Sequence, residues 1–193
     1  KPNLPIYFPI SDTTYIKNGV SITDTFYHTV PPFEFINQSG KSFTNSSVDG
    51  KIKVVNYIFT RCGKQCPDMT SKLQDVYETF KGDNDVVILS HTVDPVYDTP
   101  SVLLEYAKQN KIAADNWFFL TGNKDSLYKQ AYKGYKISAL EDETVEGGFL
   151  HSDKVLLVDK NNQIRGFYTN TDYDDIKRLI TEIGVLQTFY END

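Results

Sequence analysis

The residues with the clearest chemical potential are Cys62 and Cys66, which lie in the stretch NYIFTRCGKQCPDMT and are the only cysteines in the sequence. A pair at this spacing can form a structural disulfide, act as a redox couple or supply two ligands of a metal site. Small secreted domains that depend on disulfides carry more than one pair. Because a chain of 193 residues can build a core without a disulfide, this pair is free to take part in chemistry.

The position of the pair favours reactive thiols. Residues 51–59 (KIKVVNYIF) are predicted to form a buried central strand, and the residues after the pair have the apolar spacing of a helix. Sites in open α/β sheets lie where strands end, and the amide groups of a helix N-terminus favour negative charge. Since the cations of Arg61 and Lys64 act in the same direction, we expect a lowered pKa for both thiols.

The spacing of the pair also suits a metal ion. Residues four apart on a helical turn have Cβ atoms roughly 5–6 Å apart, whereas a disulfide needs about 3.8 Å. Thiolates select copper(I) or zinc, and two sulfurs leave such an ion in need of a third ligand. His28 precedes the predicted core, and His91 is expected to be a partly buried strand residue bonded to its neighbours. His151, after the acidic loop SALEDETVEGG, is the preferred ligand, with a surface strand histidine as the alternative.

The remaining elements predict one α/β domain. Residues 1–30 are expected to form an irregular arm or short edge strands, and PPFEFINQSGKSFT is predicted to be a hairpin around residues 37–40. DVVILSHTV and NWFFLTG are predicted strands, and KVLLVDKNNQIRGFY a second hairpin that turns at residues 160–162. Helices are predicted after the cysteines, in DTPSVLLEYAKQN, around Leu127 and in DYDDIKRLITEIGVLQTF. This order predicts, for residues 31–193, a mixed sheet with helices on both faces.

Composition excludes some classes of function. The net charge is −6 without a run of Lys and Arg, which argues against a nucleic-acid surface. No apolar segment approaches the roughly 20 residues that span a bilayer. The sequence begins at Lys1 rather than Met, which is expected of a trimmed or processed protein, so the lack of an anchor here does not exclude one outside it.

Four segments resemble the Sco/SenC family, which are copper-binding assembly factors of cytochrome c oxidase with a thioredoxin-like fold. The segments are GKIKVVNYIFTRCGKQCPDMT, LSHTVDPVYDTPSVLLEYA, NWFFLTG and HSDKVLLVDKNNQIRGFY. They extend over roughly residues 31–186 in the order found in the family. The resemblance implies an α/β thioredoxin-like domain with an extra N-terminal hairpin. One departure is residues 63–65, Gly-Lys-Gln, where the family usually has acidic residues or proline.

The resemblance also implies a site and a role. It assigns Cys62, Cys66 and His151 as ligands of copper(I), with copper(II) as a second state. It places Asp94 and Asp98 where they shape the site or a partner surface, whereas turn formation and helix capping are their alternative roles. It implies delivery of copper to the copper-centre subunit of cytochrome c oxidase, or exchange with another copper donor or acceptor. Family members are usually membrane-anchored and face the periplasm or the mitochondrial intermembrane space.

Other functions for the cysteine pair are weighed against copper delivery. A thiol–disulfide oxidoreductase that reduces the copper-ligand cysteines of a client does not need His151, and it stays open, although thioredoxins use C-x-x-C. A thiol peroxidase needs Thr three residues before its reactive Cys, but Thr60 is two before Cys62. A structural zinc site needs four ligands. A structural disulfide explains neither His151 nor the four family segments. The sequence therefore predicts a copper chaperone, for which no chemical turnover is required.

Overall fold

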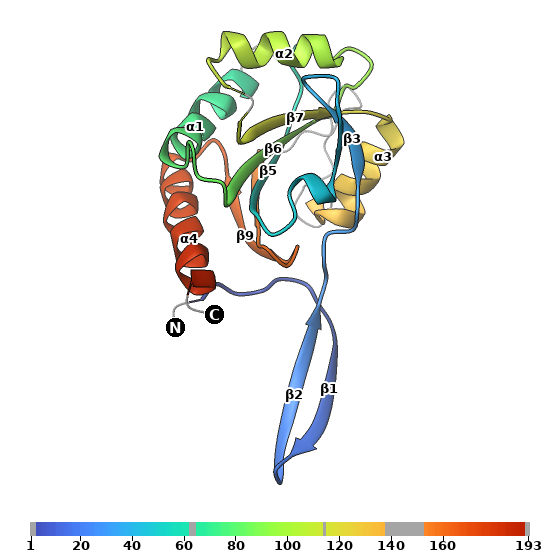
Figure 1. The fold of residues 1–193 in the computed structure, drawn as a ribbon, viewed down its shortest axis with the longest axis vertical. Coiled ribbons are helices and arrows are strands. Elements are labelled where there is room, and N and C mark those ends of the chain that lie inside the picture. Colours follow the sequence, from blue (N-terminus) through green and yellow to red (C-terminus); the bar gives the residue numbers. More distant parts are fainter. Residues whose placement is uncertain (1–2, 62–64, 114, 138–152, 192–193) are drawn as a thin grey trace.

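The computed structural model describes residues 3–61, 65–113, 115–137 and 153–191, without the side chains of residues 65–67. Its centre is a seven-stranded mixed sheet in the order β4-β3-β7-β6-β5-β8-β9 (Figure 1). The strands are β3 (Glu34–Asn37), β4 (Ser42–Thr44), β5 (Ile52–Ile58), β6 (Val86–Thr92), β7 (Trp117–Thr121), β8 (Lys154–Val158) and β9 (Ile164–Thr169). β5, β6 and β7 are parallel, and the other neighbours are antiparallel. The predicted mixed sheet and the two predicted hairpins within it are confirmed.

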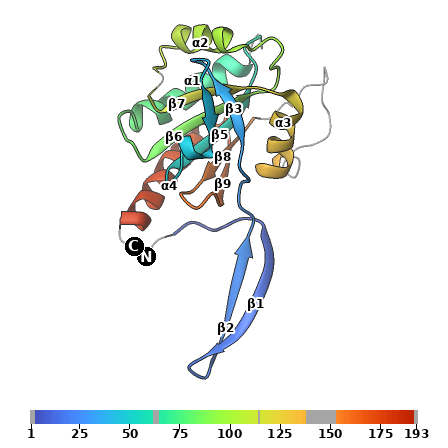
Figure 2. The same ribbon diagram turned by 45° about the vertical axis from the view of Figure 1, so that its right-hand side comes forward.

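Helices cover both faces of the sheet, as predicted (Figures 1 and 2). They are α1 (Gln65–Thr79), α2 (Pro100–Gln109), α3 (Lys124–Lys129), which continues into the π-helical turn η2 (Gln130–Gly134), and α4 (Tyr173–Glu191). A short 3₁₀ turn, η1 (Asn45–Ser47), follows β4. One hydrophobic cluster joins α1, α2 and α4 to the sheet, and a second joins α3 and η2 to its opposite face.

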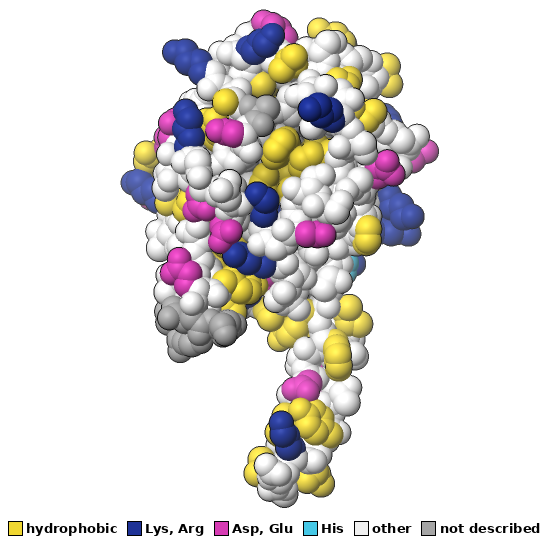
Figure 3. All heavy atoms as spheres, viewed as in Figure 1, with side chains coloured by type: hydrophobic (Ala, Val, Ile, Leu, Met, Phe, Trp, Pro, Cys, Tyr) yellow, Lys and Arg dark blue, Asp and Glu magenta, His cyan; other side chains and the backbone are white. Residues whose placement is uncertain are grey.

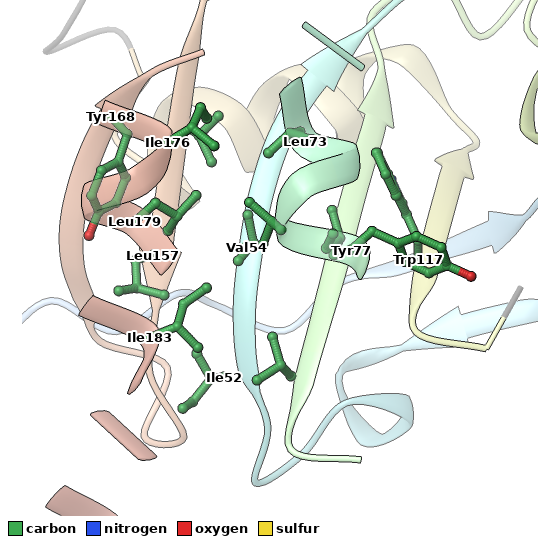
Figure 4. Packing of buried hydrophobic residues seen from close by; sticks show 14 of the residues in the cluster. Ile52, Val54, Leu73, Tyr77, Trp117, Leu157, Tyr168, Ile176, Leu179 and Ile183 are labelled. Atoms are coloured by element: carbon green, nitrogen blue, oxygen red, sulfur yellow. The ribbon is translucent and has the colours of Figure 1, made fainter. Parts of the chain in front are cut away.

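The central strand β5 contributes side chains to both hydrophobic clusters. Every residue of β5 is buried, and alternate side chains point to opposite faces. Val54 packs in the cluster of α1 and α4, whereas Val55 packs in the cluster of α3. Figure 4 shows Val54 between Leu73 of α1 and Leu157 of β8. A strand that is buried on both faces requires apolar residues at successive positions, which is why the continuous apolar run predicted β5 correctly.

The first thirty residues differ from the expectation of an irregular arm or short edge strands. Two strands, β1 (Pro9–Lys17) and β2 (Val20–Tyr27), form a separate antiparallel hairpin that projects from the domain (Figures 1 and 2). Every residue of β1 is exposed, and the hairpin carries hydrophobic side chains on its surface (Figure 3). Asn18 and Gly19 both have positive φ, at 53° and 77°. Asn-Gly between extended runs is the strongest short-range hairpin signal, and it is the only mark of this hairpin in the sequence because burial imposes no apolar period on its strands.

The base of this hairpin is attached to the β8–β9 hairpin of the domain. The Tyr7 amide donates to the Ile164 carbonyl at 3.0 Å, and the Val30 amide donates to the Asn162 carbonyl at 2.8 Å. Arg165 donates to the Pro5 carbonyl at 2.9 Å and forms a buried ion pair of 2.7 Å with Asp159. The segments before and after the projecting hairpin are therefore fixed, while the hairpin itself is exposed. The domain boundary at residues 30 and 31 stays a prediction.

We expect the projecting hairpin to contribute little to stability. Replacing residues 10–26 with Gly-Gly should change the free energy of unfolding by about 0.5 kcal/mol or less, because these side chains are mostly exposed. Arg165→Ala should lower it by about 3–5 kcal/mol, because Asp159 would remain buried without its partner. Urea unfolding of the three proteins provides the measurement, and a large loss in the hairpin-deleted protein would contradict this view.

Candidate functional site

The predicted copper ligands lie at or beyond the limits of what the structure describes. β5 ends at Ile58, four residues before Cys62, and α1 begins at Gln65, so Cys66 is the second residue of this helix. Cys62, His151 and the acidic loop at residues 138–148 lie outside the described residues. In the described part of the chain, no three His, Cys, Asp or Glu side chains come together as a metal site. No helix there is long and apolar enough to cross a membrane.

The sheet nevertheless fixes where the segments that contain the predicted ligands join the fold. β5 and β8 are antiparallel neighbours, with Lys53 opposite Val158 and Val55 opposite Leu156. The end of β5 and the beginning of β8 therefore lie at the same edge of the sheet. In the sequence, Cys62 follows that end of β5, and His151 precedes Lys154, the first residue of β8, by three positions.

Asp98 holds the two parallel strand ends together beside this edge. Its carboxylate is fully buried and accepts hydrogen bonds from the Thr60 amide at 3.2 Å and from the Thr60 hydroxyl at 2.5 Å. The Thr92 hydroxyl donates at 2.5 Å to Oδ2 of Asp98, which is also the oxygen that accepts from the Thr60 amide. Thr60 follows β5 and Thr92 ends β6, so Asp98 fixes the position at which the chain leaves β5 toward Cys62.

Asp94 pairs with Arg61, one of the two cations that were expected to lower the pKa of the thiols. Arg61 donates to Asp94 at 2.5 Å and lies over the ring of Tyr97, 4.2 Å from its centre. The hydrogen bond to Asp94 raises the pKa of Arg61, so the guanidinium stays charged. Its charge is matched by Asp94, however, and Arg61 is therefore a weaker aid to thiolate formation than a free cation.

The alternative roles considered for these aspartates are confirmed only in part. The Asp94 carbonyl accepts from the amides of Tyr97 at 3.1 Å and Asp98 at 2.9 Å, which is the expected turn. Helix capping by Asp98 is wrong, because Thr99 occupies the N-cap position of α2. Sequence reasoning also missed Thr60 and Thr92 as partners of Asp98. A threonine at the end of each of two neighbouring predicted strands was the available signal.

His91 is more deeply enclosed than predicted. Its ring is fully buried and contacts the rings of Phe33, Phe35, Tyr57 and Tyr135, with the Tyr57 ring stacked at 5.1 Å. Neither ring nitrogen has a partner of close hydrogen-bond geometry, and weaker contacts with the backbone of Leu89 and Asn56 are what the ring retains of the expected bonding. Burial lowers the pKa of His91 to about 3, and His91 therefore stays neutral near pH 7.

The third histidine has a structural partner. His28 follows the projecting hairpin, and its Nε2 donates to the Gly134 carbonyl at 2.7 Å. This bond ties the base of the hairpin to the end of η2.

We expect Asp98→Asn to lower the free energy of unfolding by about 1–3 kcal/mol, because an amide NH₂ cannot accept the hydrogen bonds that one carboxylate oxygen receives. Asp12→Asn, an isosteric change at an exposed site, should have an effect near zero. Urea unfolding can be followed by the fluorescence of Trp117, which is the only tryptophan and is fully buried. Equal stability of the two variants would show that the Asp98 carboxylate is dispensable.

Burial of His91 predicts a pH dependence. Between pH 6.5 and about pH 3 the unfolded chain binds a proton that the folded state excludes, so stability falls as the pH falls. At pH 5 this residue should cost about 2 kcal/mol relative to pH 7. His91→Phe should remove that part of the decline, whereas His28→Gln should retain it. Identical pH profiles of stability for the two variants would disprove this assignment.

Comparisons with known proteins agree with this fold. A family model described as SCO1/SenC matches residues 23–186. The "SCO1 protein homolog" of Bacillus subtilis (strain 168) is 36% identical over 163 residues, which cover 82% of this chain and 84% of the relative.

Two solved structures give the same result. The crystal structure of a SCO1/SenC family lipoprotein from Bacillus anthracis matches with a TM-score of 0.72 at 26% identity, covering 82% of this chain and 95% of the other. Arabidopsis thaliana ScoI with copper bound matches with a TM-score of 0.65 at 27% identity, covering 81% of this chain and 99% of the other. The thioredoxin-like fold is thereby confirmed, and the chain belongs to the SCO1/SenC family.

Proposed function

We propose that the protein binds copper(I) through Cys62, Cys66 and His151 and delivers it to the binuclear copper centre of a respiratory cytochrome c oxidase. The observation that carries this proposal is the antiparallel pairing of β5 with β8, which brings the chain ends leading to the cysteines and to His151 to one edge of the sheet. The copper-bound relative from Arabidopsis supports copper as the metal.

The donor set suits copper(I). Two thiolates and one imidazole are soft to intermediate ligands, and thiolate is the side chain that copper(I) prefers. Cys66 is the second residue of α1, where the helix dipole favours a negative sulfur. Zinc is less well matched, because a structural zinc site takes four ligands.

Delivery is a ligand exchange in which copper is the cargo. Thiolates of the acceptor replace the sulfurs of Cys62 and Cys66 one at a time, and the copper ion remains copper(I) throughout. The exchange therefore needs no oxidant or reductant. Loss of His151 from the ion leaves a two-sulfur site that is more open to an incoming thiolate. The state that holds the ion and the state that is open to exchange thus differ in one imidazole bond.

The place of action follows from the same proposal. We place the domain on the periplasmic side of a bacterial membrane, held there by an anchor outside the present sequence. The Bacillus anthracis relative is a lipoprotein, which supports attachment to a membrane surface. The mitochondrial intermembrane space is the alternative location. The partners are the copper-centre subunit of the oxidase or another copper donor or acceptor.

Anaerobic copper(I) titration against a competing chelator tests the ligand set. The reduced protein should bind one copper(I) tightly, and Cys62→Ser or Cys66→Ser should abolish tight binding, because each leaves a single sulfur. His151→Ala should weaken binding by much less than either, because both sulfurs persist. His28→Gln is the matched control and should bind as the unmodified protein does.

Two results would contradict the copper proposal in different ways. Equal copper affinity of His151→Ala and the unmodified protein would remove His151 from the site. Negligible copper binding, together with rapid exchange of Cys62 and Cys66 against a thiol buffer, would favour a thiol–disulfide oxidoreductase that reduces the cysteines of a client.

A further inference from the structure

A groove of about 370 Å³ lies beside the segment that leads to the cysteines. One wall contains Thr60 and Tyr97, and the other is a face of α2 that includes Ser101, Val102 and Glu105. Ser101 and Glu105 are one helical turn apart, so they line the groove along the helix axis. The volume lies within the range of about 300–1,000 Å³ that is typical of binding sites.

The walls of this groove are fixed before any partner binds. Asp98 holds Thr60 against the end of β6, and the Arg61–Asp94 ion pair lies over the ring of Tyr97. Tyr106 of α2 also lines the groove, and its hydroxyl forms a hydrogen bond of 2.8 Å with the hydroxyl of Thr70 in α1. A preformed groove binds without the cost of ordering its own walls.

The groove is continuous with the proposed copper site along the chain. Thr60, which lines the groove, precedes Cys62 by two residues. Cys66 is the second residue of α1, the helix whose Thr70 bonds to the groove residue Tyr106. A protein that takes copper from these cysteines must bring its own sulfurs into contact with the ion. Its backbone must therefore pass over the surface next to this segment, where the groove lies.

The rim indicates which chemistry such a segment should have. Tyr97, which lines the groove, is 45% exposed, and its chain neighbour Val96 is 86% exposed, so the two offer apolar contact beside the groove. Glu105 is exposed on the α2 wall and forms no ion pair with another described residue. The charge of Arg61 is matched by Asp94, so the groove retains the negative charge of Glu105.

We propose that this groove binds an extended segment of the copper-accepting protein, with an apolar side chain over Val96 and Tyr97 and a basic side chain toward Glu105. The proposal rests on the proposed copper delivery and names the docking surface that serves it. The net charge of −6 would also draw a basic segment toward this face.

Copper transfer to a defined acceptor tests the groove. The acceptor is the reduced, metal-free soluble domain that carries the binuclear copper site of a cytochrome c oxidase. Val96→Asp and Glu105→Lys should each slow transfer by about fivefold or more, because they remove the apolar contact and reverse the charge. Both variants should retain the copper(I) affinity of the unmodified protein in chelator competition, because neither residue is a proposed ligand.

Matched substitutions on the projecting hairpin control for charge. Val20→Asp and Asp12→Lys make the same changes at exposed positions and should transfer copper at the unmodified rate. Transfer by Val96→Asp and Glu105→Lys at the rates of these controls would overturn the groove alone. Failure of the unmodified, copper-loaded protein to pass copper to the acceptor would overturn copper delivery and the groove with it.

Discussion

The edge of the sheet at which β5 and β6 end depends for its arrangement on the hydrogen bonds of the buried Asp98 carboxylate. Two parallel strands, β5 and β6, end side by side, and after each of them the chain turns away from the sheet and leads into a helix. A buried carboxylate is costly unless its oxygens receive hydrogen bonds, and here Thr60 and Thr92 supply them. The same hydrogen bonds that make burial of Asp98 tolerable thus fix the point at which the chain leaves β5. They also fix the turn that contains Asp94, the partner of Arg61, and one wall of the groove along α2.

The second constraint is the register between β5 and β8. Every residue of β5 is buried, and its side chains alternate between two separate hydrophobic clusters. A slip of one residue would exchange Val54 with Val55 between these clusters, so the register is strongly specified. Antiparallel pairing at this register sets the beginning of β8 beside the end of β5. That the chain leaves β5 toward the cysteines and enters β8 from His151 at one edge of the sheet is therefore a consequence of how the core packs.

Sequence patterns predicted the elements whose side chains are buried. β5, β6 and α1 were predictable because burial imposes a continuous apolar run on the strands and a period of 3.6 on the helix. The projecting hairpin, β1 and β2, lacks that signal because most of its residues are exposed and none is fully buried, and only Asn18-Gly19 marks it. The full burial of His91 was not predictable, since Phe33 and Tyr135, which enclose it, come from distant segments. The pairing of Asp98 with Thr60 likewise depends on tertiary structure.

The proposed site draws its ligands from two connections of the fold. Asp98 and the Arg61–Asp94 pair fix the chain at the end of β5, and the proposed sulfur ligands follow within one turn of α1. The proposed imidazole comes from a different connection, the one that enters β8. A carrier must bind its metal tightly yet release it to a partner, and these demands conflict if every ligand is equally fixed. Drawing the ligands from two connections resolves the conflict, because one bond can be lost while the other two keep the ion in place for the acceptor.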